Sequence, residues 1–471
     1  MLYFIEVVLP LAVSKTFTYK VSEAEFHYIQ IGMRVAVPFG KTKIYTALVL
    51  DKNNTPPQLY EAKEIHQILD ESPVVNSFQI EHWKWIASYY MCSLGEVFRS
   101  ALPAGYILES ETIISAKEHS EIDSNDLKDD EYLILEALKM QSSITIQEVV
   151  KILGKKTVFP IINRLLAKGA LVLQEEIAEL YKPKLVRYIK LQDDFLQHDK
   201  LAELLELLSK AKKQRELVLH YFQLQAQDKN PISVKKLTET SGSSAAIVKS
   251  LVDKNIFEEY YIAQDRVTFD KGENSHFALS EAQQKAFDSI EDNFKPFDVS
   301  LLHGVTASGK TEIYIKLLEQ YVQQVLFLLP EIALTTQLVQ RLTAYFGNEV
   351  AVFHSKYSNN ERIEVWNQVL ENSPKAKVVI GVRSAMFLPF SNLGCIIVDE
   401  EHEQTYKQHD PAPRYHARDA AIVLAKQHNA KVLLGSATPS LETYYNVQTK
   451  KYGLTDLKVR YGNVVLPEIL L

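Results

Sequence analysis

The distribution of apolar residues divides the chain into a β-rich start, a helical middle and an alternating α/β end. Within residues 1–110, short β-branched and aromatic runs are separated by Pro, Gly, Lys and Asn, which is typical of strands in a small barrel. The stretch NSFQIEHWKWIASYYMCS has apolar positions at helical spacing and predicts a helix that closes this module.

Residues 125–180 have the pattern of a winged-helix domain. Three amphipathic segments, DDEYLILEALKM, TIQEVVKIL and TVFPIINRLLAKG, precede a short strand. A similar pattern returns over residues 200–268, which we interpret as a second winged-helix-like module or a linker. Such modules bind DNA or act as spacers that contact proteins, and both roles stay open.

From residue 272 to residue 471 apolar runs such as VSLLH, VLFLLP and CIIVDEE alternate with helical segments. Near-continuous apolar strands belong in a mostly parallel sheet covered on both faces. The predicted fold class is multidomain α/β, with a β-rich N-terminal domain, winged-helix-like modules and a C-terminal α/β lobe.

Composition adds little to this picture. The chain has 471 residues, of which 46% are hydrophobic and 24% charged, as in ordinary globular proteins. The net charge of −7 means that any nucleic-acid binding must come from local patches. The densest basic stretches, YKPKLVRYIK and SKAKKQRE, fit either a solvated face or phosphate contacts.

The apolar runs and the N-terminus indicate the cellular compartment of the protein. No apolar run reaches the roughly 20 residues of a membrane span, and the N-terminus lacks a basic n-region. We expect a cytoplasmic protein with no membrane partner. Cys92 and Cys395 are too far apart in sequence to suggest a metal knuckle and are expected to be buried thiols.

The stretch GVTASGKT, residues 304–311, follows an apolar strand and precedes a helical segment. It fits the phosphate-binding pattern in which Gly304 and Gly309 bracket backbone N–H groups aimed at phosphate oxygens. Thr306 lies within the loop, Lys310 would hold the β and γ phosphates, and the Thr311 hydroxyl would bind Mg²⁺. ATP with Mg²⁺ is therefore the expected cofactor.

Two carboxylates favour hydrolysis. In CIIVDEEH, Asp399 and Glu400 follow a buried strand, where ligands bind in open α/β sheets. Asp399 could bind Mg²⁺ and Glu400 could activate water, although acidic residues at strand ends also serve as helix caps. In LGSATPS, Ser436 and Thr438 are candidate links between the nucleotide and polymer sites, or simply turn residues.

The ordered set GVTASGKT, LLPEIALT, GVRSAMF, VDEEH and LGSATPS resembles the first RecA-like lobe of superfamily 2 helicases. More narrowly, DEEHEQTYKQHDPAPRYHARDAA resembles a loop of the primosomal protein N′ family of replication-restart helicases. LPLAVSKTFTY, VAVPFGK, IHQILDESPV and ALPAGY are similar to that family's amino-terminal domain, which captures the 3′ end of a leading strand. The resemblance therefore covers both ends of the chain.

The resemblance implies an ATP-dependent 3′-to-5′ DNA helicase that recognises stalled forks and promotes primosome assembly and replication restart. Its partners would be forked DNA, primosome proteins and single-stranded DNA-binding protein. The 3′-end pocket would use Phe17, Gly40 and Lys63 for stacking, close backbone approach and phosphate contact. Thr18 stands where the family commonly has an acidic residue, and a hydroxyl is a weaker acceptor.

Further residues follow from the same resemblance. Gln283 matches an adenine-contacting glutamine, with adjacent Gln284 as the alternative. An aromatic-rich loop would couple DNA binding to hydrolysis through Tyr406, Lys407, Arg414, Tyr415 and Arg418. In that loop Pro413 stands where a close relative may carry tryptophan, which would weaken stacking. His402 and His416 fit hydrogen bonding better than metal binding.

The resemblance also implies a second motor lobe and a cysteine cluster for two zinc ions, and two cysteines cannot build that cluster. We therefore expect an amino-terminal fragment or a truncated gene product. Two alternatives stay open: a module that binds forks without unwinding them, and a superfamily 2 ATPase that acts on another nucleic acid.

Overall fold

The computed structural model describes most of the chain, namely residues 2–40, 43–58, 60–107, 110–116, 127–155, 158, 161–162, 164–165, 168, 170–177, 184–192, 195, 198–227, 231–263, 278–330, 336–354 and 357–461. The chain divides into two compact units, Met1–Tyr181 with Phe269–Leu471, and Lys182–Thr268. Part of the predicted helix TVFPIINRLLAKG, and residues 331–335 of LLPEIALT, lie outside the described residues.

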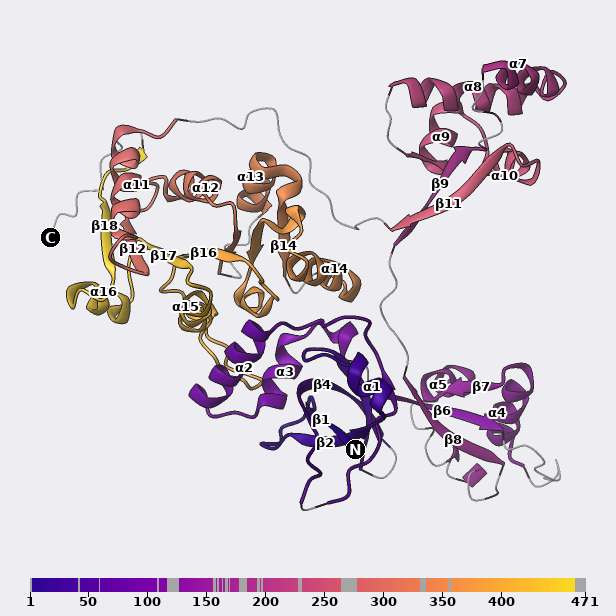
Figure 1. Ribbon diagram of the computed structural model, residues 1–471, viewed down its shortest axis with the longest axis horizontal. Coiled ribbons are helices and arrows are strands. Elements are labelled where there is room, and N and C mark those ends of the chain that lie inside the picture. Colours follow the sequence, from indigo (N-terminus) through magenta and orange to yellow (C-terminus); the bar gives the residue numbers. More distant parts are fainter. Residues whose placement is uncertain are drawn as a thin grey trace. The chain divides into compact units, whose positions relative to one another are not determined.

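The N-terminal module is a five-stranded antiparallel sheet in the order β2-β1-β4-β3-β5 (Figure 1). Its strands are β1 (Tyr3–Val8), β2 (Phe17–Val21), β3 (Arg34–Phe39), β4 (Lys43–Asn53) and β5 (Gln67–Ile68), and its helices are α1 (Glu23–Tyr28), α2 (Ser77–Tyr89) and α3 (Leu94–Ala101). Helix α2 confirms the predicted helix and starts at a capping box formed by Asn76 and Gln79.

A three-stranded sheet, β7-β6-β8, organises the next module. It comprises β6 (Ser110–Ala116), α4 (Asp129–Met140), β7 (Ser143–Thr145), α5 (Ile146–Leu153) and β8 (Leu171–Ile177). Strand β6 precedes the first helix and pairs with both other strands, so the sheet starts earlier in the chain than the helical pattern suggested.

The smaller unit is built in the same way, with the sheet order β10-β9-β11. Its elements are β9 (Leu185–Leu191), α7 (His198–Leu207), α8 (Lys212–Gln227), β10 (Ile232–Ser233), α9 (Val234–Ser241), α10 (Ala245–Asp253) and β11 (Phe257–Ala263). Residues 185–190 of the basic stretch YKPKLVRYIK lie in strand β9. Its Arg187 and Lys190 face Glu259 and Glu258 of β11 at 3.6 and 3.1 Å, so part of its charge is already paired.

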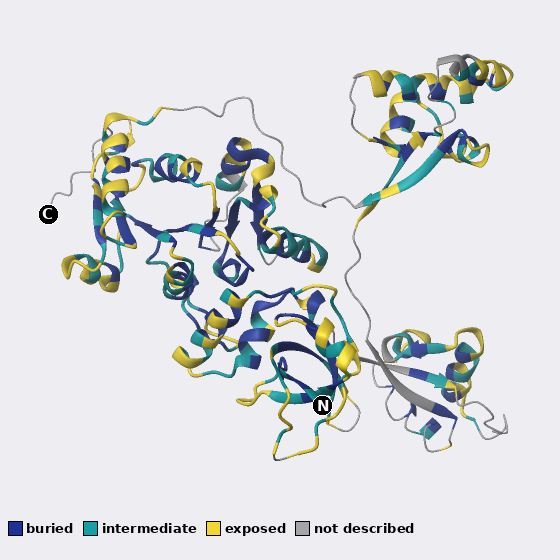
Figure 2. Ribbon diagram, viewed as in Figure 1, coloured by how far each residue is buried: buried dark blue, intermediate teal, exposed yellow. Residues whose placement is uncertain are grey.

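The C-terminal lobe is a seven-stranded parallel sheet in the order β14-β15-β13-β16-β17-β12-β18, which confirms the predicted fold class. Its strands are mostly buried (Figure 2). The elements are α11 (Glu281–Asn293), β12 (Val299–Gly304), α12 (Lys310–Gln320), β13 (Gln324–Leu328), α13 (Thr336–Phe346), β14 (Val350–Phe353), α14 (Asn359–Leu370), β15 (Val378–Gly381), β16 (Leu393–Asp399), α15 (Ala417–His428), β17 (Lys431–Ser436), α16 (Leu441–Gln448) and β18 (Gly453–Leu457).

The strand order positions the candidate chemistry. Strand β17 lies between β12 and β16, and all three run parallel. The carboxyl ends of parallel strands meet at one edge of the sheet, where α/β proteins bind ligands. Gly304, Asp399 and Ser436 end these strands, so the phosphate loop, the acidic motif and LGSATPS share that edge.

The N-terminal module and the lobe share one hydrophobic cluster, which includes Trp83 of α2 and Trp366 of α14. Buried hydrogen bonds cross between them: the Trp366 indole N–H donates to the Val74 carbonyl at 2.8 Å, and the Gln79 amide donates to the Phe387 carbonyl at 2.6 Å. Because these groups are paired across the contact, separating the two parts would leave each partner unsatisfied.

One buried histidine, His82, and one half-buried histidine, His428, lie at this contact. His82 Nε2 is 2.9 Å from the Ala420 carbonyl oxygen, and His428 stacks on Phe78 with ring centroids 4.1 Å apart. Burial lowers the pKa of each to about 4.

Among the described residues no helix is long and apolar enough to cross a membrane.

Acid is expected to weaken this contact. Since the folded-state pKa of His82 is depressed, the unfolded chain binds more protons as pH falls from about 6.5 towards 4, and stability is lost in that window. We expect His82 to account for about 2 kcal/mol of unfolding free energy lost between pH 7.5 and 5.0. Urea unfolding followed by tryptophan fluorescence at both pH values measures this.

The matched variants are His82→Gln, which keeps a donor for Ala420 but does not titrate, and His27→Gln in α1. The first should reduce the pH dependence by the share of His82, while the share of His428 remains, and the second should leave it unchanged. An equal pH dependence in the wild type and His82→Gln would contradict the assignment.

Candidate nucleotide and DNA sites

The phosphate loop joins β12 to α12 and has the backbone that its glycines predict. Gly309, the residue before α12, has φ +82°, and Ala307 has φ +58°. A Cβ on Gly309 would lie 2.2 Å from Gln283 Nε2, and one on Gly304 would lie 3.0 Å from Lys310 Cγ. Gly309 is therefore favoured by its left-handed conformation, and a side chain on Gly304 would require Lys310 or Ser308 to shift. The loop leads directly into the N-terminus of α12, and a helix N-terminus favours phosphate.

Lys310 lies at the head of a chain of polar contacts. Its Nζ is 3.1 Å from Glu400 Oε1, and Glu400 Oε2 is 3.7 Å from His402 Nδ1. The His402 ring contacts Ser436 Oγ at 2.7 Å and Thr438 Oγ1 at 3.3 Å. The phosphate loop, the acidic motif and LGSATPS are thus connected. His402 takes a hydrogen-bonding position.

Asp399 ends β16 in a half-buried position. Its Oδ1 accepts a hydrogen bond of 2.8 Å from the hydroxyl of Tyr314, which is fully buried on α12. Burial raises the pKa of Asp399 to about 6, with a further contribution from the charge of Glu400, against the lowering effect of the Tyr314 hydrogen bond. Glu400 itself has φ +45°, a strained conformation for a non-glycine residue.

The donor set fits Mg²⁺ carried in with a nucleotide. Thr311 and Asp399 supply a hydroxyl and a carboxylate oxygen, the hard ligands that Mg²⁺ prefers, and phosphates and water would complete its shell. Among the described residues no group of three or more His, Cys, Asp or Glu could hold a metal ion. A metal brought by phosphates needs few protein ligands, so these residues suit it.

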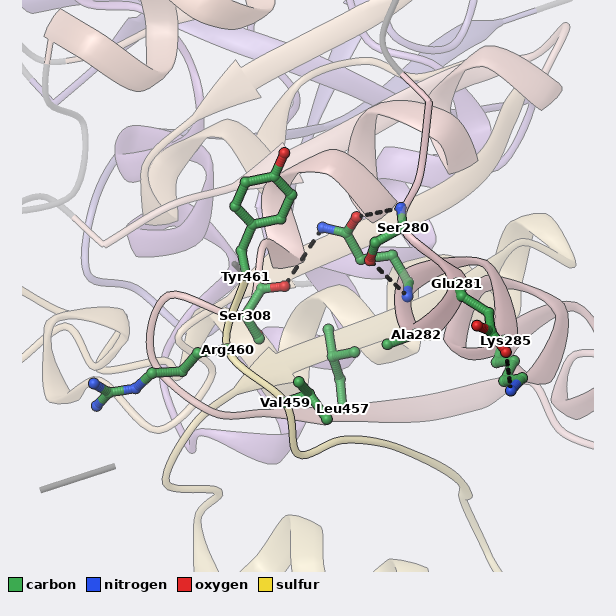
Figure 3. A pocket seen from close by; sticks show the side chains of 10 residues that line it. Ser280, Glu281, Ala282, Lys285, Ser308, Leu457, Val459, Arg460 and Tyr461 are labelled. Atoms are coloured by element: carbon green, nitrogen blue, oxygen red, sulfur yellow. Dashed lines mark hydrogen bonds and ion pairs between the residues drawn. The ribbon is translucent and has the colours of Figure 1, made fainter. Parts of the chain in front are cut away.

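A cavity of about 490 Å³ opens beside the phosphate loop (Figure 3). Gln283 lines it and is buried, with Oε1 accepting from the Ser280 N–H at 2.9 Å and Nε2 lying 3.3 Å from the Gly309 carbonyl oxygen. The alternative, Gln284, instead donates to Asp288 on the exposed side of α11. Gln283 is therefore the glutamine that lines the cavity. In this structure its amide oxygen and its amide nitrogen both contact backbone groups of the protein.

A second cavity, of about 340 Å³, lies in the N-terminal module. It brings together the four residues predicted there, Phe17, Thr18, Gly40 and Lys63. Phe17 packs edge-to-face on Phe39 with centroids 5.0 Å apart, and Lys63 Nζ donates to the Gly40 carbonyl at 3.0 Å.

Sequence reasoning missed two residues of this second cavity. Tyr60 accepts a hydrogen bond of 2.8 Å from the Thr18 backbone N–H. Glu61 also lines the cavity, and within the described part of the chain its carboxylate has no hydrogen-bond or ion-pair partner. Because Thr18 is neutral, Glu61 is the carboxylate that this cavity offers.

The prediction that side chains of the aromatic-rich loop contact DNA needs a correction for three residues. Tyr406, Tyr415 and Arg418 are buried, at 0%, 1% and 7% exposure, so their side chains do not face a DNA strand in this structure. The Tyr406 hydroxyl lies 3.0 and 2.7 Å from the carbonyl oxygens of Leu328 and Asp399. We therefore reassign these three residues to positioning, because their side chains are used inside the fold.

The other two predicted DNA contacts of that loop, Lys407 and Arg414, are not buried. Arg414 is exposed, and Lys407 is half-buried, with its ammonium 5.2 Å from the Tyr90 ring centroid. Pro413 is buried, and its carbonyl accepts a hydrogen bond from the Gln408 side chain at 3.0 Å. Position 413 therefore serves loop closure here, and Arg414 and Lys407 remain the accessible cations.

Comparison with known proteins identifies the domains in which the two cavities lie. Residues 6–103 match the model of a 3′DNA-binding domain (3′BD), and residues 280–447 match that of the DEAD/DEAH box helicases. Residues 111–176 match a winged helix domain, and residues 186–263 match the winged helix domain of PriA helicase from Bacteroidota.

Curated relatives extend over the whole chain. The replication restart protein PriA of Bacillus subtilis is 32% identical over 475 residues, which cover 98% of this chain and 56% of the relative. The chain belongs to the PriA family. PriA of Haemophilus influenzae is 34% identical over 92% of this chain and 49% of its own length. PriA of Rickettsia prowazekii is 47% identical over 41% of this chain and 30% of its own length. The chain spans about half the length of the first two relatives.

One residue of this PriA-family chain was not singled out from its sequence. Glu401 is fully buried beside the catalytic candidates and pairs with Arg418 at 2.8 Å. Its carboxylate also accepts hydrogen bonds from the Ser440 N–H at 2.7 Å and the Thr443 hydroxyl at 2.9 Å. Glu401 therefore ties the acidic motif to the end of the aromatic-rich loop and to the start of α16.

Removing one partner of a buried ion pair leaves the other charge uncompensated. We expect Glu401→Ala to lower the free energy of unfolding by about 3–5 kcal/mol, because Arg418 stays buried without its partner. Glu442→Ala, an exposed change on α16, is the control and should change little. Chemical unfolding of the three proteins measures the difference, and equal stabilities of the two variants would contradict this role of Glu401.

Proposed function

We propose that this chain forms the fork-recognising part and first motor lobe of an ATP-dependent 3′-to-5′ DNA helicase that restarts stalled replication. The observation that carries the proposal is the occurrence, in one compact unit, of a phosphate loop with its acidic motif and of a cavity within a 3′DNA-binding domain. The PriA relatives support replication restart as the process.

In this proposal the loop N–H groups and Lys310 bind the phosphates of ATP. Lys310 then exchanges its contact with Glu400 for the phosphates, because phosphate oxygens carry more charge than one carboxylate. Glu400 becomes available to orient and deprotonate the attacking water. When bound, Mg²⁺ neutralises charge on the β and γ phosphates, with Thr311 and Asp399 as its protein ligands.

The contacts of His402 suggest how the state of the nucleotide site would reach DNA. A change at Glu400 alters the charge beside His402, which contacts Ser436 and Thr438. These two residues precede α16, which is bonded through Glu401 and Arg418 to the aromatic-rich loop. We assign Ser436 and Thr438 to coupling, and Arg414 and Lys407 to strand contact.

Partners follow from the family. Primosome proteins and single-stranded DNA-binding protein are the expected protein partners, and forked DNA with a leading-strand 3′ end is the expected nucleic acid. The two zinc ions belong, in this proposal, to sequence outside this chain. A fork-binding protein without unwinding activity is the second candidate, because the cavity of the N-terminal module is separate from the phosphate loop.

Lys310→Ala is expected to lower fork-stimulated ATP hydrolysis by about 100-fold or more, because the γ phosphate loses its cationic contact. Lys316→Ala, on the same helix but away from the loop, is the control. Phosphate release is measured with and without a fork that carries a leading-strand 3′ end. Fork binding without turnover in the wild type would favour the second candidate, and hydrolysis unaffected by Lys310→Ala would overturn the assigned site.

The 3′-end cavity is tested by fluorescence anisotropy. Phe17→Ala should weaken binding of a 3′-hydroxyl fork by about tenfold, through loss of base stacking. Tyr28→Ala, at an exposed tyrosine outside the cavity, should bind like the wild type. Equal affinities of wild type and Phe17→Ala would contradict the role of the cavity.

Glu61 is expected to discriminate between end groups. A 3′-phosphate would place negative charge beside its carboxylate, whereas a 3′-hydroxyl can donate to it. The wild type should bind a 3′-hydroxyl end more tightly than a 3′-phosphate end, and Glu61→Gln should reduce that preference. Glu64→Gln, which removes an exposed charge paired with Lys20, should keep it. An unchanged preference in Glu61→Gln would show that another group distinguishes a 3′-hydroxyl from a 3′-phosphate.

A further inference from the structure

The cavity beside the phosphate loop has a wall that no motif predicts. On one side lie residues from the start of α11, including Glu281 and Lys285, and on the other lie Arg460 and Tyr461, which follow β18 (Figure 3). We call residues 457–461 the exit strap, because they leave the sheet at its edge strand. Leu457, Val459, Arg460 and Tyr461 of the exit strap all line the cavity.

The exit strap is hydrogen-bonded to three successive residues of the phosphate loop. The Val305 N–H donates to the Leu457 carbonyl at 3.1 Å, and the Tyr461 N–H donates to the Ala307 carbonyl at 2.9 Å. Between them, the Arg460 guanidinium donates to the Thr306 hydroxyl at 3.3 Å. The strap thus follows the loop, so a ligand on the loop also meets the strap.

The cavity holds polar groups that the described part of the chain leaves unsatisfied. Ser308 is 2% exposed and lines the cavity, and its buried hydroxyl has no hydrogen-bond partner there. The buried Nε of Arg460 is likewise without a partner among the described residues. Buried polar groups without partners are costly, so a ligand with oxygen or nitrogen acceptors would be stabilised here.

The shape and chemistry of the wall suit a planar base. The Tyr461 side chain is 67% exposed, while Leu457, Val459 and Ala282 add apolar surface to the cavity. An aromatic ring beside a phosphate cradle offers a stacking face for the base of the same nucleotide. The Arg460 guanidinium, held at Thr306, offers donors to ribose or phosphate oxygens.

We propose that Tyr461 of the exit strap stacks on the base of the nucleotide held by the phosphate loop and that Arg460 contacts its ribose or phosphate. This inference rests on the proposed ATP site and deepens it. Since every base has a π-face, stacking alone does not select adenine, and ATP and GTP should depend on Tyr461 alike. Nucleotide binding would also stabilise the position of the exit strap.

Calorimetry with ATP and with inorganic tripolyphosphate, which has no base, tests the stacking. Tyr461→Ala should weaken ATP binding by about tenfold and leave tripolyphosphate binding unchanged, whereas Tyr461→Phe should bind ATP like the wild type. Tyr444→Ala, at an exposed tyrosine of α16 outside the cavity, is the control. Equal ATP affinities in the wild type and Tyr461→Ala would overturn the inference.

Lys310→Ala separates this inference from the proposed function, because it should weaken ATP and tripolyphosphate together. If Lys310→Ala has that effect and Tyr461→Ala has none, the phosphate site is supported and the contact between Tyr461 and the base is contradicted. If the wild type binds neither ligand, the phosphate site and the base contact are both contradicted.

Trypsin gives an independent readout, because Lys458 and Arg460 place two of its cleavage sites in the exit strap. ATP should slow cleavage there more than tripolyphosphate does, and Tyr461→Ala should remove that difference. Equal protection of the wild-type strap by both ligands would overturn the inference.

Discussion

The parallel pairing of β12, β17 and β16 is the constraint on which the candidate chemistry depends. The register pairs His303 with Ser436 and Asp399 with Gly435, so three segments that are far apart in sequence end at the same level. Gly435 is also required by packing, since a Cβ there would lie 1.8 Å from the Tyr314 hydroxyl that holds Asp399. A slip of one residue would separate Asp399 from Lys310 and point its carboxylate to the other face of the sheet.

Around this edge, positions are held by buried groups that do not themselves touch a ligand. Tyr314 orients Asp399, Tyr406 contacts the carbonyl oxygen of the same residue, and Glu401 binds Arg418. Such groups are satisfied inside the fold, so the residues that face solvent can be few. This division explains why the tyrosines and Arg418 of the aromatic-rich loop are buried while Arg414 is exposed and Lys407 is half-buried.

Local patterns predicted the part of the site that is local in structure. The phosphate loop and the acidic motif each depend on a strand, a turn and a helix, so Lys310 and Asp399 could be placed from their neighbours. Burial of Tyr406, Tyr415 and Arg418 depends on contacts with distant segments, whereas the resemblance of the loop and its residue types suggested DNA contacts. Tyr461 and Glu61 belong to no motif, and only folding brings them to their cavities. Strand β9 was missed because its alternation is partly charged, although those charges pair across the sheet.

The core shared by the N-terminal module and the lobe has a consequence for biosynthesis. Residues 1–181 and 269–471 form one compact unit that is interrupted in sequence by residues 182–268. At about 5–20 residues per second, the ribosome needs roughly fifteen to sixty seconds to pass from the end of the N-terminal sheet to Trp366. During that interval the surface of α2 that carries Gln79, His82 and Trp83 has no partner, since Phe387, Ala420 and Trp366 have not been made. The nascent chain therefore exposes apolar surface during synthesis, and a lobe produced without the first hundred residues would expose the matching face.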